Sequence, residues 1–137
     1  MNHLHFQYFN LGAVVVSALI QWLLGALWYS PVLFAKPWMA LVGIEKGKHK
    51  SMVPGMISSF IGSLLLSYVL AHVVVWALSM TFRRGALVGF VCWVGFIAAP
   101  NFAQGIYESR PFKLFAINTG YWLVGLIITG GLLAVWR

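Results

Sequence analysis

The side chains best suited to chemistry in this chain form a polar group near the ends of its last two apolar segments. The group consists of Asn101, Gln104, Glu108, Arg110, Lys113 and Asn118. The first three follow one another at spacings of three and four residues, which places them on one face of a helix that continues to Glu108. A polar cluster in an otherwise apolar protein is the first place to look for a ligand or ion site.

Two interpretations of this polar group are open. Amides in membrane helices commonly fasten one helix to another, at about 1 kcal/mol each, and Glu108 beside Arg110 or Lys113 can form an ion pair at a helix end. Alternatively, the same groups bind a ligand or an ion. Pro100 lacks a backbone N–H, so it predicts a kink in the chain immediately before Asn101.

The inventory of reactive residues argues against an enzyme. The chain contains only two acids, Glu45 and Glu108, which are 63 positions apart, so chemistry that needs paired carboxylates has no pair. His72 has no acid in any apolar segment to orient its imidazole. His3 and His5 are two ligands, which do not make a metal site, and no phosphate-binding glycine loop or cofactor motif is present. We therefore expect no catalytic residues, no cofactor and no bound metal.

The elements that must position the polar group are long apolar segments. Four of them contain no Asp, Glu, Lys or Arg: Leu11–Trp28, Met56–Met80, Ala86–Ala103 and Leu114–Trp136. A helix of about 20 such residues crosses a hydrocarbon core of about 30 Å. With 61% hydrophobic and 8% charged residues, the chain cannot cover a core with a polar shell.

The predicted fold is therefore all-α, a polytopic membrane protein with a four-transmembrane-helix bundle. We expect one domain, residues 1–137, with spans at about 11–29, 55–80, 86–105 and 114–136.

The first loop is the only connection long enough to hold structure of its own. Pro31 and Pro37 end the first span, and the apolar residues of Trp38–Val42 follow at helical spacing before Gly43. This pattern predicts a short interfacial helix with its aromatic face inward. The charged run Glu45–Lys50 is expected to form a solvated tip.

Small residues recur on one face of the second span. At a constant spacing of four, they are Gly55, Ser59, Ser63, Ser67 and Ala71. Because lipid removes the hydrophobic drive between helices, such a stripe favours close packing, against a span of this chain or of a neighbour. Gly125, Gly130 and Gly131 can also admit a close neighbour, and the isolated Gln21 and His72 are each expected to hydrogen-bond within the bundle.

The distribution of basic residues predicts the orientation of the spans. Six lie in the first and third connections: Lys36, Lys46, Lys48, Lys50, Arg110 and Lys113. Three lie on the opposite side: Arg83, Arg84 and Arg137. This bias places the first loop in the cytoplasm and both termini outside, in the cytoplasmic (inner) membrane of a bacterium. The net charge of +7 is expected to face anionic lipid headgroups rather than nucleic acid.

Two parts of the chain resemble a known family. The segments that carry the resemblance are Gly25–Pro31 with Lys36 and Trp38, and Glu108–Pro111 continuing through Leu114–Asn118 and Gly120–Trp122. They are similar to the small membrane proteins grouped as domain of unknown function family 1761. The resemblance covers nearly the whole chain and implies a compact four-span protein. It implies no activity, cofactor or catalytic residue.

Two functions from different classes fit these patterns. We favour a non-enzymatic helix-packing or accessory protein that forms a homo-oligomer or joins a larger membrane assembly. The alternative is a small oligomeric transporter or channel that uses the polar group at the cytoplasmic end of spans three and four. No acid lies at mid-membrane, which argues against proton-coupled export of cations.

The orientation can be tested with single cysteine replacements at Ser51 and Asn2. Because the charge bias places position 2 outside, a membrane-impermeant thiol reagent added to intact cells should label the cysteine at position 2 and not the one at position 51. The reverse pattern would show that the protein is inserted the other way round.

Overall fold

The computed structural model describes residues 10–30, 32–42 and 53–136, and the regular structure of these residues is helical throughout. The elements are α1 (Leu11–Trp28), α2 (Ala35–Val42), α3 (Val53–Trp76), α4 (Phe82–Cys92), η1 (Trp93–Ala98), α5 (Ala99–Tyr107) and α6 (Phe112–Val135). Four continuous helices are long and apolar enough to cross a membrane, since α4, η1 and α5 form one span, Phe82–Tyr107. The predicted fold class is confirmed.

The short helix α2 occupies the place predicted for an interfacial helix in the first loop. Its expected stop at Gly43, the charged run Glu45–Lys50, and His3 and His5 all lie outside the described residues.

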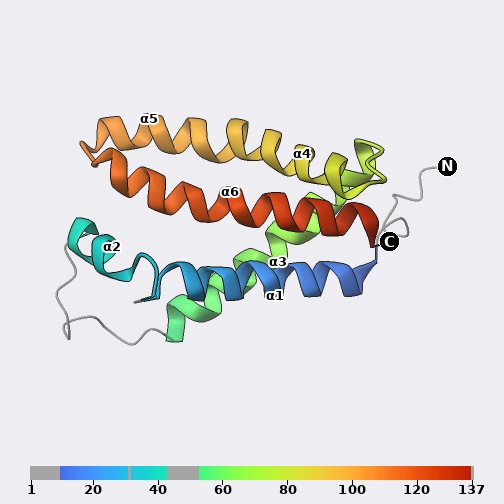
Figure 1. Ribbon diagram of the computed structural model, residues 1–137, viewed down its shortest axis with the longest axis horizontal. Coiled ribbons are helices and arrows are strands. Elements are labelled where there is room, and N and C mark those ends of the chain that lie inside the picture. The colour runs from blue at the N-terminus through green and yellow to red at the C-terminus, as the bar shows by residue number, and fades with distance from the viewer. Residues whose placement is uncertain (1–9, 31, 43–52, 137) are drawn as a thin grey trace.

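The last helix lies at the centre of the bundle. In Figure 1, α6 runs between α1 on one side and the span α4–η1–α5 on the other, and α3 crosses obliquely to contact both α1 and α6. The helix α2 and the turn between α5 and α6 lie at one end of the molecule, and the turn between α3 and α4 lies at the other. Each of the other spans contacts α6.

Side-chain caps and turns set the helix ends. Asn10 accepts a hydrogen bond from the Gly12 N–H at the start of α1, and Thr81 accepts one from the Arg84 N–H at the start of α4. The cap at Thr81 starts the third span about four residues earlier than its apolar pattern predicts.

The second span ends at Trp76, about four residues before its apolar pattern ends. The Ser79 N–H reaches the Val74 carbonyl and the Leu78 N–H reaches the Val75 carbonyl, which is a Schellman turn. Leu78, at φ 55°, takes the left-handed position that glycine usually occupies. Because the turn residue is a leucine, the apolar pattern continues past the end of the helix.

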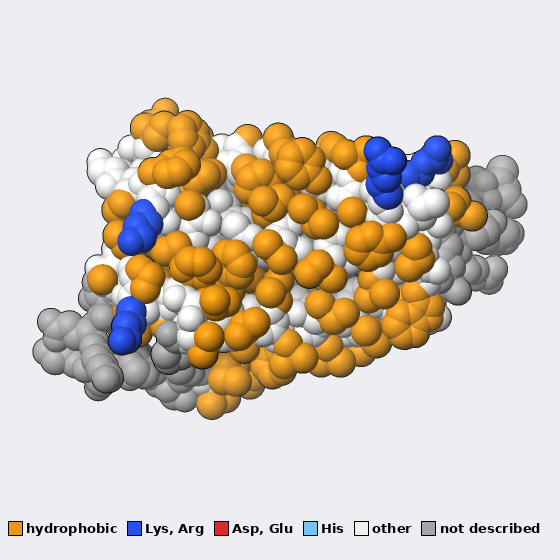
Figure 2. Space-filling view, viewed as in Figure 1, with side chains coloured by type: hydrophobic (Ala, Val, Ile, Leu, Met, Phe, Trp, Pro, Cys, Tyr) orange, Lys and Arg blue, Asp and Glu red, His pale blue; other side chains and the backbone are white. Residues whose placement is uncertain are grey.

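The surface of the bundle is suited to lipid. Figure 2 shows hydrophobic side chains along the length of the molecule and Lys or Arg side chains only towards its two ends, on the face that is drawn. Large apolar side chains on each span are exposed, among them Leu23, Leu65, Phe96 and Val135. In water such a surface would aggregate, whereas in a bilayer it contacts acyl chains.

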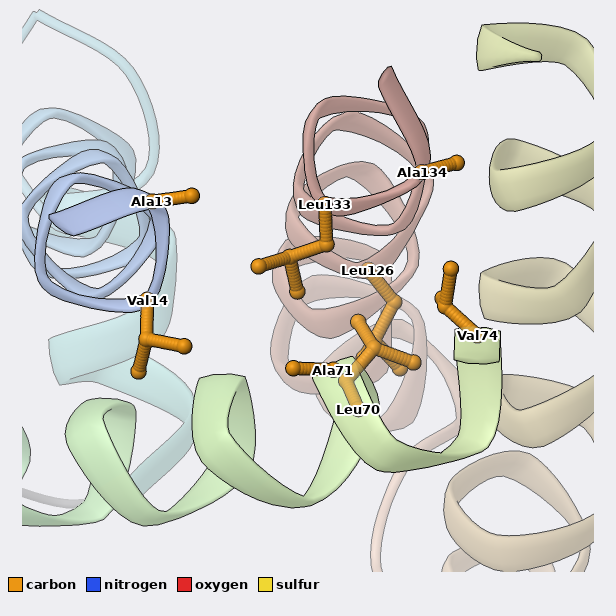
Figure 3. Close-up of a cluster of buried hydrophobic side chains, with 8 residues drawn as sticks. All are labelled: Ala13, Val14, Leu70, Ala71, Val74, Leu126, Leu133 and Ala134. Atoms are coloured by element: carbon orange, nitrogen blue, oxygen red, sulfur yellow. The ribbon is translucent and has the colours of Figure 1, made fainter. Parts of the chain in front are cut away.

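The apolar core lies where α1, α3 and α6 meet. Figure 3 shows its buried members, Ala13, Val14, Leu70, Ala71, Val74, Leu126, Leu133 and Ala134. Five of the eight are Ala or Val, so the three helices can approach closely.

The third span touches α6 through glycine. Across Phe82–Tyr107, all of which the structure describes, the only buried residues are Gly85 and Gly89. A Cβ atom on Gly85 would collide with the carbonyl oxygen of Gly130, and one on Gly89 would collide with that of Leu126. The two helices therefore meet backbone to backbone, in the manner of a GxxxG motif.

This contact predicts a strong difference between two glycines of the same span. Gly89→Ala should lower the free energy of unfolding by about 1–3 kcal/mol, because the new methyl group must push α4 away from α6. Gly95→Ala is the matched control, since a Cβ there has no neighbour within 4 Å, and it should leave stability unchanged or raise it. Thermal unfolding of both variants in detergent measures the difference. Equal effects would mean that α4 and α6 do not touch at Gly89.

Candidate functional site

The structure separates the polar group at the end of spans three and four into parts. Asn101 and Gln104 are exposed on α5, and the Asn101 amide donates to the carbonyl of Ile97 in its own helix, at 2.7 Å. Asn101 therefore makes no side-chain hydrogen bond to another span among those the structure gives. The expected disturbance at Pro100 takes the form of the π-helical turn η1, which ends two residues earlier.

The two charges at the end of α5 pair locally. Arg110 Nε lies 3.1 Å from Glu108 Oε2, and the chain turns between them at Ser109, which has a φ of 55°. Both side chains are more than one third exposed, so the pair contributes little to stability. Lys113 is also exposed at this end of the molecule. The charged part of the polar group is thus a surface feature that faces the headgroup region.

Asn118 accepts one of the hydrogen bonds that join the end of the first span to the last. The hydroxyl of Tyr29 donates to Asn118 Oδ1 at 2.8 Å, and the Trp28 indole N–H beside it donates to the Ile117 carbonyl at 2.8 Å. Burial, with a smaller contribution from Tyr121, raises the pKa of Tyr29 to about 12. The phenol therefore keeps its proton at neutral pH and remains a donor to Asn118.

A small pocket of about 30 Å³ opens between α5 and α6. Its lining consists of Asn101, Gly105, Arg110, Leu114, Phe115, Asn118 and Thr119. The structure thus brings three of the six predicted residues, Asn101, Arg110 and Asn118, to one pocket, whereas the other three do not line it. Its volume is that of about one water molecule, so in this conformation it is not a path for a solute.

The stripe of small residues on α3 divides into two halves. Gly55 and Ser59 are exposed, and the Ser59 hydroxyl bonds back to the Gly55 carbonyl at 2.7 Å. Ser63, Ser67 and Ala71 are buried inside the bundle. Because α3 crosses obliquely, only the second half of the stripe lies against other spans of this chain.

A second polar cluster lies in the centre of the bundle. Its members are fully buried, at 0 or 1% exposure, and come from α1, α3 and α6: Ser17, Gln21, Ser63, Ser67 and Thr129. We refer to them as the central polar layer. The sequence interpretation treated Gln21 as an isolated residue and did not single out Ser17. Ser17 and Gln21 are four residues apart, as the serines on α3 are, and this shared spacing could have indicated a polar face on the first span.

Two contacts fix the position of Gln21 in this layer. Its amide lies against Gly125 so closely that a Cβ atom there would collide with it. The Tyr121 hydroxyl donates to the Gln21 backbone carbonyl at 2.8 Å, which uses its only proton. That hydroxyl also approaches the side chains of Gln21 and Ser63, but neither side chain makes a hydrogen bond of acceptable geometry.

Five polar atoms of the central polar layer have no hydrogen-bond partner in the described chain. They are Ser17 Oγ, Gln21 Nε2, Gln21 Oε1, Ser63 Oγ and Ser67 Oγ. Thr129 differs, because its hydroxyl donates to the Gly125 carbonyl of its own helix at 2.8 Å. An unpaired buried polar group costs about 1–3 kcal/mol. Five of them would cost about as much as the whole stability of an ordinary domain, about 5–15 kcal/mol.

No metal centre forms among the described residues, where no three His, Cys, Asp or Glu side chains lie together. His72 Nδ1 lies 2.9 Å from the Tyr68 carbonyl in its own helix, and its ring packs against Tyr68 and Trp76. The buried side-chain polar atoms without a partner in the described residues belong to amides and hydroxyls.

A family model described as Protein of unknown function (DUF1761) matches residues 12–134 of the chain. The match confirms the resemblance drawn from the segments at the ends of the first and third spans, and it covers nearly the whole sequence. No curated protein and no solved structure gives a significant match.

The hydrogen bonds of the two asparagines predict different effects of the same substitution. Asn118→Ala should lower the free energy of unfolding by about 0.5–2 kcal/mol, because it removes the acceptor of the bond from Tyr29 on another helix. Asn101→Ala should change it much less, since that side chain bonds only within its own helix. Thermal unfolding in detergent compares the two, and a larger loss for the Asn101 variant would contradict these assignments.

Proposed function

The chain belongs to the family described as Protein of unknown function (DUF1761), and from its geometry we propose that it is a non-enzymatic membrane protein that assembles with a second copy of itself. The proposed contact is the exposed surface of the third span at its α5 end, where Gln104 is exposed and Asn101 lies at the mouth of the pocket beside α6. The reason lies in how little of this span the rest of the chain covers.

The third span leaves a large surface to its surroundings. Apart from Gly85 and Gly89, its residues in the described structure are exposed or half-buried. The exposed side chains include Val91, Phe96 and Phe102.

The two amides carry the proposal. Asn101 lies six residues before Tyr107, the last residue of α5, which is about 9 Å at about 1.5 Å per residue. An amide at that depth faces hydrocarbon unless another protein helix covers it, and amides hydrogen-bond across helix contacts in membranes. Because an amide both donates and accepts, it can pair with the same residue across a two-fold axis. This self-complementarity favours a second copy as the partner.

The charge distribution supports an orientation for this assembly. The end that carries Lys36, Arg110 and Lys113 is proposed to face the cytoplasm and anionic lipid headgroups, in the inner membrane of a bacterium. The chemistry supports a non-enzymatic role, since Glu108, the single acid in the described residues, pairs with Arg110. A transporter through the pocket beside Asn118 has less support, because that pocket holds about one water molecule.

The proposal predicts the mass of the purified protein. In a mild detergent, light scattering or native mass spectrometry should give a multiple of the 15.2 kDa chain. Replacing Asn101 and Gln104 together by Leu should shift the population to monomer by removing the paired amides. Ser58→Leu, at an exposed polar site on α3, is the control and should keep the wild-type mass.

Three results would contradict the proposal. A monomeric wild-type protein would reject self-assembly, and an unchanged mass for the double variant would place the contact elsewhere. Stoichiometric recovery of a different subunit would make the chain a member of a mixed complex instead.

A further inference from the structure

We propose that the central polar layer is a binding site for water, held by Gln21, Ser17, Ser63 and Ser67 in the middle of the membrane-spanning bundle. The site is distinct from the proposed contact between copies, which lies on the opposite side of α6 from α1.

The polar side chains of the layer are buried but unpaired. Gln21, Ser17 and Ser67 are 0% exposed and Ser63 is 1% exposed, yet their five side-chain polar atoms have no partner in the described chain. Buried polar groups in folded proteins are nearly always hydrogen-bonded, to the protein or to ordered water. The described chain provides no partner for these atoms in this conformation, and water is a partner that needs no change of rotamer or fold.

The packing of the helices brings these atoms to one place. Gln21 lies against Gly125, and the Tyr121 hydroxyl approaches both Gln21 and Ser63. The antiparallel register of α1 and α6, set by Trp28 with Ile117 and by Gln21 with Gly125, places Ser17 beside Thr129. Gln21 and Ser63 therefore meet near the Tyr121 hydroxyl, and Ser17 and Ser67 are each one helical turn away on the same two helices.

The chemistry of the lining selects the ligand. The central polar layer consists of amide and hydroxyl groups, so an ion would find no opposite charge, and it would pay a large desolvation cost at this depth. An apolar ligand would leave all five atoms unpaired. Water both donates and accepts, and a buried water makes two to four hydrogen bonds, so about two water molecules can hydrogen-bond to all five unpaired atoms. Glycine at position 125 leaves room for the amide that anchors them.

Radiolytic hydroxyl-radical labelling read by mass spectrometry tests this directly, because radicals formed from bound water modify the side chains beside it. In the wild-type protein in lipid nanodiscs, Tyr121 should be labelled although it is only 7% exposed. In Gln21→Met, which keeps the size of the side chain and removes the amide, the labelling of Tyr121 should be lost. Ser59→Ala, on the exposed half of the stripe, should retain it.

Stability gives a second, independent measurement. If water molecules hydrogen-bond to the Gln21 side-chain amide, Gln21→Met removes these hydrogen bonds and should lower the Tm. If the layer is dry, the same change replaces an unpaired amide by an apolar group and should raise the Tm. Absence of labelling at Tyr121 in the wild-type protein, labelling that persists in Gln21→Met, or a raised Tm for that variant would each overturn the proposal.

Discussion

Close contact between helix backbones around α6 is the constraint on which the rest of this structure depends. Lipid solvates apolar side chains as well as protein does, so burying them does not drive helices together in a membrane. Here the third span reaches α6 where Gly85 and Gly89 meet the carbonyls of Gly130 and Leu126. On another side of α6, the Gln21 amide lies against Gly125. Both approaches require the absence of a Cβ atom.

The polar side chains within the spans fall into groups according to their partners. Ser59, Asn101 and Thr129 donate hydrogen bonds to carbonyls of their own helices. These bonds satisfy the polar groups but do not connect one helix to another. The Tyr29 hydroxyl donates to the Asn118 side chain, and the Trp93 indole N–H donates to the Thr119 carbonyl. These two bonds connect the end of α1 and the turn η1 to α6. The other members of the central polar layer, Ser17, Gln21, Ser63 and Ser67, differ from both groups because their side-chain polar atoms are buried without a partner in the described chain.

The third span shows how one segment combines two roles. Its first half, α4, packs against α6 through Gly85, Gly89 and the Phe82 ring, and leaves Leu87, Phe90 and Val91 exposed. Pro100 cannot donate a backbone hydrogen bond, and the helix before it widens into η1. Beyond that turn, Asn101 and Gln104 of α5 are exposed. Within η1, the Trp93 indole N–H donates a hydrogen bond to the Thr119 carbonyl of α6.

The sequence by itself determined the class of the fold, the number of spans and the short helix in the first loop. These properties are local: they depend on the length of an apolar segment, on a proline, and on the absence of charge. The tertiary structure decided which faces touch. Apolar residues surround each span, so the pattern does not mark a buried side as it does in an amphipathic helix in water. For this reason the sequence pattern pointed to Asn101, whose side chain is exposed and bonds within its own helix. It did not link Gln21 to Ser17, Ser63 and Ser67, because their common burial depends on how three helices distant in the sequence pack together.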